Sequence, residues 1–118
     1  MTQSRNVYIV DGARTPFLKA RSHVGPFSNS DLAVACARNL LLRHNFSWDE
    51  INEVIIGSMV AHPAEPNVAR VIALRLGMEK IPAFTVQRNC ASGLQALDTA
   101  AKLIASGDHE LVLAGGAD

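Results

Sequence analysis

Short β-rich runs alternate with amphipathic helical runs along all 118 residues, and this alternation constrains the fold more than any other feature. The predicted strands are residues 7–10, 54–60, 83–87 and 111–114. The run 54–60 is almost continuously apolar, which is typical of a strand covered on both faces. Because strands separated by helices need crossover connections, the pattern predicts a layered βαβ fold of the α/β class, with a mainly parallel sheet flanked by helices.

Three amphipathic runs between these strands have apolar residues at helical spacing. They are residues 31–44, 68–76 and about 91–105. Ser30 is the predicted N-cap of the first helix, with Asp31 in its first turn. Arg43 and His44 are predicted to lie in its last turn, as a helix C-terminus prefers.

Local signals also place the ends of the shorter elements. Asn67 is the predicted N-cap of the second helix, and Gly77 is the predicted residue after its end. Ser47 and Glu50 are three residues apart, as in a capping box, and predict one short helical turn. Residues 18–29 are mostly polar and contain glycine and proline, so they are predicted to be a loop.

The composition excludes several classes of protein. A chain that is 48% hydrophobic and 19% charged is not of the disordered class, and its length suits one domain. Eleven basic and eleven acidic residues cancel, and 5% of residues are aromatic, so we expect no nucleic-acid partner. The four histidines lack the spacing of metal ligands, so we expect no metal site.

The sequence also gives expectations about the compartment. Residues 1–6 lead into the first strand pattern without an apolar leader, and no uncharged stretch approaches the roughly 18 residues of a membrane span. Two cysteines, Cys36 and Cys90, are too few for a disulfide framework and suit reduced thiols. We therefore expect a cytoplasmic protein, with Cys36 packed in the core on the apolar face of its helix.

The strongest candidate for chemistry is Cys90, in the run Asn89-Cys90-Ala91-Ser92-Gly93 between a predicted strand and a predicted helix. Backbone N–H groups and the helix dipole favour a thiolate at such a position. A thiolate is the natural nucleophile for taking an acyl group from a thioester, and a nearby N–H is able to stabilise an oxyanion. The alternative is a buried, inert cysteine.

The motif around Cys90 resembles the acyl-cysteine motif of thiolases. Residues 7–17 (Val-Tyr-Ile-Val-Asp-Gly-Ala-Arg-Thr-Pro-Phe) resemble the N-terminal signature of that family. Residues 67–70 and 111–116 also fall where the family has its own versions. Asp118 stands where many thiolases have Glu, a variant similar to the β-subunit type of fatty-acid oxidation complexes, although one residue leaves the branch open.

The resemblance implies a two-step acyl transfer. Cys90 would attack a 3-ketoacyl-CoA, release acetyl-CoA and hold the shortened acyl group until a second coenzyme A takes it; the reverse steps condense two acyl-CoAs. It implies coenzyme A thioesters as substrates, with no permanently bound cofactor. It also implies a homo-dimer that pairs through the edge strand from Ala83 to Gln87.

The resemblance implies that residues 1–118 are the first part of a thiolase N-terminal domain, an incomplete half-domain. In the family, an Asn-Glu motif, a His motif that activates the cysteine, a second acid/base Cys and a loop domain that grips coenzyme A follow later. We therefore expect this polypeptide to be inactive alone. The alternatives are a ketoacyl synthase relative, against which the N-terminal signature argues, and a non-catalytic dimerisation piece.

The remaining candidates are predicted to have structural roles. Arg14 is expected in a turn with a salt bridge, and His62 in a solvated loop. Gly115 and Gly116 are expected to allow tight packing rather than to form a phosphate-binding loop, because they lack the glycine spacing of a dinucleotide site. The basic residues of the polar loop, Lys19 and Arg21, are expected to be solvated.

Overall fold

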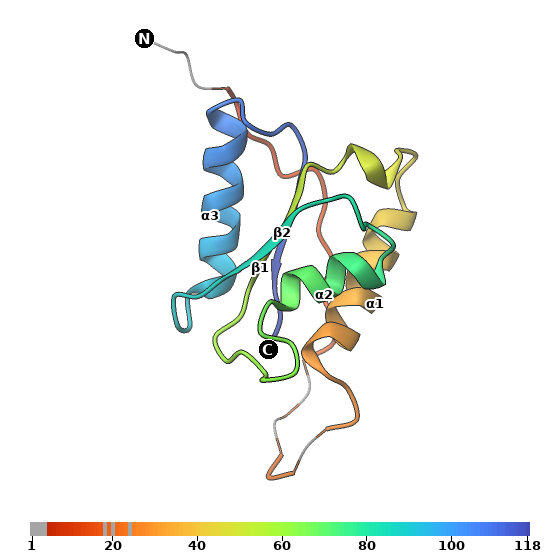
Figure 1. Ribbon diagram of the computed structural model, residues 1–118, viewed down its shortest axis with the longest axis vertical. Coiled ribbons are helices and arrows are strands. Elements are labelled where there is room, and N and C mark those ends of the chain that lie inside the picture. Colours follow the sequence, from red (N-terminus) through yellow and green to blue (C-terminus); the bar gives the residue numbers. More distant parts are fainter. Residues whose placement is uncertain (1–4, 18, 20, 24) are drawn as a thin grey trace.

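The computed structural model describes residues 5–17, 19, 21–23 and 25–118, and it shows an α/β fold around a parallel three-stranded sheet (Figure 1). The strands lie in the order β2-β1-β3, and they are β1 (Glu53–Gly57), β2 (Ala83–Val86) and β3 (Val112–Gly116). The helices are α1 (Asn29–Leu42), the 3-10 turn η1 (Trp48–Glu50), α2 (Val68–Arg75) and α3 (Ser92–Ala105). The predicted fold class is confirmed.

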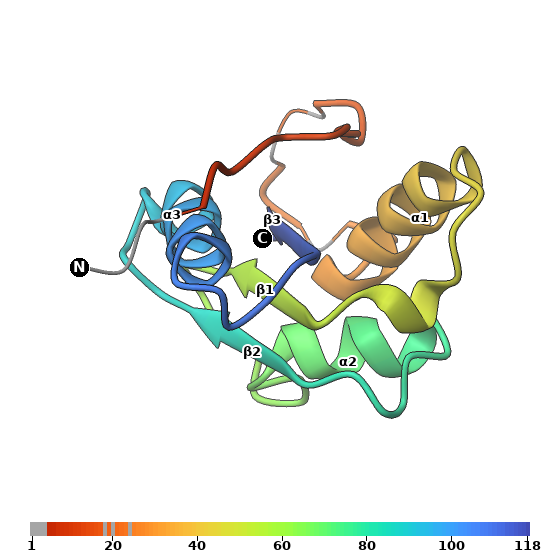
Figure 2. The same ribbon diagram turned by 90° about the horizontal axis from the view of Figure 1, so that it is seen from above.

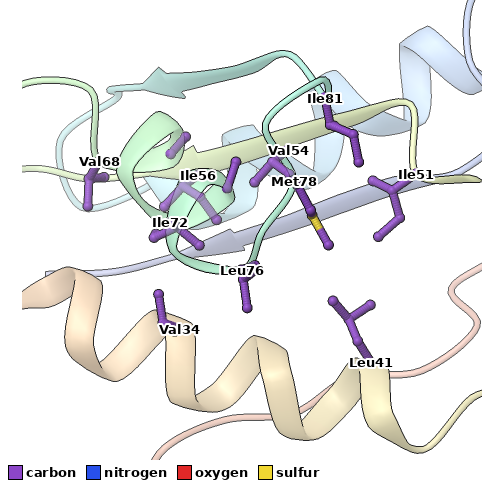
Figure 3. Close-up of a cluster of buried hydrophobic side chains, with 12 residues drawn as sticks. Val34, Leu41, Ile51, Val54, Ile56, Val68, Ile72, Leu76, Met78 and Ile81 are labelled. Carbon is purple, nitrogen blue, oxygen red and sulfur yellow. The ribbon is translucent and has the colours of Figure 1, made fainter. Parts of the chain in front are cut away.

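Strand β1 lies at the centre because its side chains are apolar on both faces. Val54 and Ile56 pack in a cluster with α1 and α2, whereas Ile55 packs in a second cluster with α3. Figure 2 shows the layers, with α1 and α2 on one face of the sheet and α3 on the other. Figure 3 shows Val34 and Leu41 of α1 directed toward the larger cluster. The prediction of a strand covered on both faces is therefore confirmed for residues 54–57, whereas residues 58–60 lie beyond the end of the strand and Met59 and Val60 are exposed.

The register brings the carboxyl ends of all three strands to one edge of the sheet. Gly57 of β1 is opposite Val86 of β2 on one side and Gly116 of β3 on the other. The segments that follow these three residues are consequently neighbours in space. In α/β folds, functional loops lie at this carboxyl edge of the parallel sheet.

Helix α1 begins two residues earlier than predicted, because Ser28 rather than Ser30 is its N-cap. Ser28 and Asp31 form a reciprocal capping box: the Asp31 N–H donates to Ser28 Oγ at 3.1 Å, and the Ser28 N–H donates to Asp31 Oδ2 at 2.9 Å. Ser30 is fully buried instead. Its hydroxyl donates to Glu65 Oε1 at 2.7 Å and accepts from Arg75 Nη1 at 2.9 Å.

The predicted ends of the shorter elements are confirmed. Asn67 caps α2, accepting from the Arg70 N–H at 3.2 Å, and it ties that helix to β2 by accepting from the Thr85 hydroxyl at 2.8 Å. Gly77 follows the helix with a left-handed φ of 82°. The turn η1 has its capping box, since the Ser47 N–H donates to Glu50 Oε2 at 3.1 Å.

The strand predicted at residues 7–10 is wrong, because that segment pairs with no strand in the described part of the chain. Tyr8, Ile9 and Val10 are 74%, 85% and 76% exposed. Figure 2 shows the segment passing beyond β3, on the side away from β1. A strand needs a hydrogen-bonding neighbour, and apolar, β-branched composition does not supply one.

Side chains anchor this segment instead. Asp11 accepts from His44 Nε2 at 2.8 Å and pairs with Arg43 Nη1 at 3.3 Å. Both partners lie just beyond α1, which ends at Leu42 with Arg43 as its C-cap, so they are not in its last turn as predicted. The loop predicted at 18–29 is confirmed up to Ser28 where it is described, but residues 1–4, 18, 20 and 24 lie outside the described residues.

Candidate functional site

Cys90 lies in the turn that joins β2 to α3, at the edge of the sheet where the strand carboxyl ends meet. The strand ends at Val86 and the helix begins at Ser92, two residues after the cysteine. The side chain of Cys90 is exposed and its thiol is free. The alternative of a buried cysteine is therefore wrong for this chain, and the predicted place between strand and helix is confirmed.

Two features of the turn hold Cys90 outward. Asn89 has a left-handed backbone with φ 48°, which asparagine tolerates better than most residues, and its N–H donates to Gln87 Oε1 at 2.8 Å. The buried Ser92 hydroxyl donates to the Asn89 carbonyl at 2.6 Å and accepts from the Arg88 N–H at 2.8 Å. The backbone before the cysteine is thus fixed from both sides.

The N-terminus of α3 is open to an anionic group. Its N-cap is Ala91, which provides no side-chain hydrogen bond, and the first turn has no acidic residue. The Ala91 and Ser92 N–H groups already donate to the Arg88 and Asn89 carbonyls, so the start of the helix offers the next two N–H groups, those of Gly93 and Leu94, and the positive end of the dipole. Such a terminus favours a thiolate and a developing oxyanion.

Glycines allow α3 to approach the sheet closely at this point. A Cβ on Gly57 would collide with the carbonyl group of Ser92 and lie 2.7 Å from the Gly93 nitrogen. A Cβ on Gly116 would lie 3.3 Å from the Gly93 Cα. The tight packing predicted for the Gly115-Gly116 pair is therefore observed at Gly116, and both glycines belong to β3 rather than following it.

Met59 is a neighbour of Cys90 that the sequence pattern alone did not indicate. The two sulfur atoms, Cys90 Sγ and Met59 Sδ, are 3.8 Å apart. Met59 is two residues beyond Gly57, the last residue of β1. The signal that could have found it is the parallel topology itself, since segments after adjacent parallel strands meet at one edge of the sheet.

Cys36 is half-buried on α1 rather than enclosed in the core. It lines a cleft of about 210 Å³ between α1, the segment before it and the end of β3, together with Arg14, Phe17 and Asp118. Arg14 donates to the Thr15 carbonyl at 3.1 Å and lies over the Phe17 ring at 4.8 Å, and the described residues provide no partner for its predicted salt bridge. Cys36 and Cys90 therefore differ in surroundings, which makes Cys36 a natural reference thiol.

The histidines are dispersed, and His44, His62 and His109 each contact a different group. His62 is exposed in its loop, as predicted, and its Nδ1 accepts from the Ala64 N–H at 3.1 Å. His109 Nε2 is 2.6 Å from Glu53 Oε2. His23, Lys19 and Arg21 are exposed. No group of three or more His, Cys, Asp and Glu side chains suited to a metal ion occurs among the residues that the structure describes.

Three carboxylates have lowered pKa values, and the largest cause of each shift lies outside the Cys90 turn. The hydrogen bond from His44, then the Gly12 N–H, lowers the pKa of Asp11. The Ser28 N–H, then Arg75, lowers the pKa of Asp31.

On α3, the hydrogen bond from Lys102 lowers the pKa of Asp98. These shifts mark structural contacts rather than a catalytic acid or base.

Within the described ranges, no helix has the length and apolar character needed to cross a membrane.

Comparisons with known proteins cover nearly the whole chain. The family profile described as "Thiolase, N-terminal domain" matches residues 7–118. The chain is 41% identical over 115 residues to the mitochondrial trifunctional enzyme subunit beta of Bos taurus, covering 97% of this chain and 24% of that protein. It is 38% identical over 118 residues to the beta-ketoadipyl-CoA thiolase of Pseudomonas knackmussii, covering 98% of this chain and 29% of that protein.

A solved structure is similar to this chain in fold as well as in sequence. The crystal structure of the Bacillus anthracis acetyl-CoA acetyltransferase superposes with a TM-score of 0.73 at 36% identity, covering 77% of this chain and 23% of that one. The chain therefore spans about a quarter of the length of the relatives that it matches.

Proposed function

The chain belongs to the thiolase family, and from this premise we propose that Cys90 carries an acyl group as a thioester in thiolase-type transfer between coenzyme A thioesters. The observation that carries the proposal is the exposed Cys90 thiol beside the uncapped N-terminus of α3. The motif that resembles the family's acyl-cysteine motif is centred on this same residue.

The proposed chemistry needs a sulfur nucleophile and a place for negative charge. In the cleavage direction, the thiolate sulfur of Cys90 bonds to the 3-keto carbon of a 3-ketoacyl-CoA. The C2–C3 bond breaks, and C2 keeps its electron pair and takes a proton as acetyl-CoA leaves. The sulfur of a second coenzyme A then bonds to the acyl carbon and releases the Cys90 thiolate. In this proposal, N–H groups at the start of α3 that lack a backbone acceptor stabilise the oxyanion of each step.

Acyl loading of the two thiols tests the proposal directly. The protein is incubated with acetyl-CoA or acetoacetyl-CoA, and acetyl groups are located by peptide mass spectrometry. We expect the adduct on Cys90 and not on Cys36, and none in Cys90→Ser, whereas Cys36→Ala leaves loading unchanged. Equal labelling of the two cysteines in folded protein, or no label on Cys90, would overturn the proposal.

The same reactions test whether the 118-residue chain turns over. The sequence predicts that it does not, because the family resemblance assigns activation of the cysteine to a His motif that follows later. Release of coenzyme A from acetyl-CoA, or of acetyl-CoA from acetoacetyl-CoA, would then stop near one equivalent per chain. The expected cytoplasmic location and the link to fatty-acid metabolism also remain proposals; among the relatives, the subunit from Bos taurus is mitochondrial.

A dimer through the outer edge of β2 is the second part of the proposal. Strand β2 lies at one edge of the described sheet, and its four residues are only partly buried. An unpaired edge strand invites a symmetric mate. Sedimentation over a wide concentration range is expected to show a dimer, and a monomer throughout would contradict this pairing. A dimer whose Cys90 takes no acetyl group would favour the non-catalytic dimerisation piece.

A further inference from the structure

The side chain of Asp118 holds the segment that follows β1. Its Oδ1 accepts from the Met59 N–H at 2.8 Å, from the Ser58 hydroxyl at 3.0 Å and from the Val60 N–H at 3.4 Å. Ser58 is buried, and Asp118 lies two residues beyond the end of β3. One carboxylate oxygen thus fixes three consecutive residues of a neighbouring loop.

The held loop is the one that contacts Cys90. Met59 Sδ is 3.8 Å from Cys90 Sγ, and the Ser58 N–H donates to the Val86 carbonyl at 3.1 Å, at the start of the turn that carries the cysteine. A continuous path of contacts therefore runs from Asp118, through the backbone of Met59, to the sulfur of Cys90. Methionine has a flexible side chain, so its place beside the sulfur depends on how firmly its backbone is held.

We propose that Asp118 is a positioning residue for Cys90. It acts through Met59, whose side chain covers one side of the Cys90 sulfur and leaves the other side open to the acyl carbon. The inference rests on the proposed function, since it assigns Asp118 to the same acyl transfer. The competing reading is that Asp118 only fastens the end of β3 to the loop after β1. The two readings differ in whether the effect of Asp118 passes through Met59.

The test measures Cys90 alone, in a Cys36→Ala background that leaves it the single thiol. Asp118→Ala removes the acceptor, and Asp118→Glu keeps a carboxylate within reach. Asp49→Ala is the matched control, because Asp49 is an exposed carboxylate in η1. For each variant, the rate of acetyl loading from acetyl-CoA, the rate of alkylation by iodoacetamide and the urea midpoint are measured.

Asp118→Ala is expected to slow acetyl loading roughly tenfold, because a misplaced nucleophile loses its alignment with the acyl carbon. Alkylation by the small reagent is expected to stay the same or rise, because it needs access rather than alignment. Asp118→Glu restores loading, and Asp49→Ala changes neither rate. In a Met59→Ala background, Asp118→Ala is expected to cause no further loss. Should Asp118→Ala not fold, Asp118→Leu, which keeps most of the side-chain volume and has no acceptor, takes its place.

The outcomes separate this proposal from the proposed function. If Cys90 of the otherwise unchanged chain takes no acetyl group, the acyl-transfer proposal fails, and with it the role assigned to Asp118. If Cys90 is loaded normally and Asp118→Ala behaves like Asp49→Ala, the positioning role is overturned while the acyl transfer stands. Equal slowing of loading and alkylation, or an undiminished effect in the Met59→Ala background, also overturns it in favour of simple fastening.

Discussion

Gly57→Ala is expected to destabilise the fold at the point where α3 meets the sheet. The added Cβ would collide with the Ser92 carbonyl group and lie 2.7 Å from the Gly93 nitrogen, and all of these atoms belong to the backbone. No side chain can rotate away, so the end of β1 and the first turn of α3 must separate. Overpacking costs about 1–3 kcal/mol where side chains adjust, and we expect about 3 kcal/mol or more where the backbone must move.

Urea and thermal unfolding, followed by circular dichroism, measure this cost. A loss of this size lowers Tm by roughly 10 °C in a domain of this length. Gly115→Ala is the matched control, because nothing lies within 4 Å of its added Cβ, and we expect it to be neutral or slightly stabilising. Gly57→Ala is also expected to slow acetyl loading of Cys90, since Ser92 holds the turn before that residue. If Gly57→Ala were no less stable than Gly115→Ala, the close approach of α3 would be refuted.

Three further predictions concern the turn and the N-terminal segment. Because Asn89 has a left-handed φ, Asn89→Ala is expected to lower the free energy of unfolding in urea by about 1 kcal/mol, and Asn89→Gly to leave it almost unchanged. Equal losses in the two variants would contradict backbone strain at this position. Ser92→Ala leaves the Arg88 N–H without its acceptor, so we expect a loss of about 1–3 kcal/mol; an unchanged urea midpoint would argue against that hydrogen bond. Because the pKa of Asp11 is lowered, its contribution to stability is present above the pKa of the unfolded state and is lost as pH falls through the pKa of the folded state. The Tm of the wild type should therefore exceed that of Asp11→Asn at neutral pH, and the two Tm values should converge in acid. A difference in Tm that stays constant with pH would contradict this linkage.

The elements that hold the site could be predicted because their signals are local. The continuous apolar run of β1 predicts burial on both faces, and capping by Asn67 needs only contacts within a few residues. The place of Cys90 follows from the same logic, because small and polar residues between a strand and a helix mark a junction. Pattern and structure agree at Asn67, Gly77 and the turn at residues 47–50, where the deciding contacts lie within a few residues.

Several of the failures share a physical cause, which is that the deciding partner is distant in sequence. Residues 7–10 have strand composition, but pairing depends on an edge that composition does not describe. Ser28 is the N-cap because it bonds reciprocally with Asp31, whereas Ser30 is buried and bonds to Glu65 and to Arg75 of α2. Met59 and Asp118 reach the site only because parallel strands end at the same edge.

The most direct test of the central claim is whether an acetyl group on Cys90 returns to coenzyme A. The protein is first loaded from isotopically labelled acetyl-CoA and freed of the excess, and unlabelled coenzyme A is then added. The account predicts that label leaves Cys90 and appears as acetyl-CoA, while any label on Cys36 stays in place. Label that remains on Cys90 in folded protein, or that leaves both cysteines at the same rate, would contradict the assignment of Cys90 as the acyl carrier.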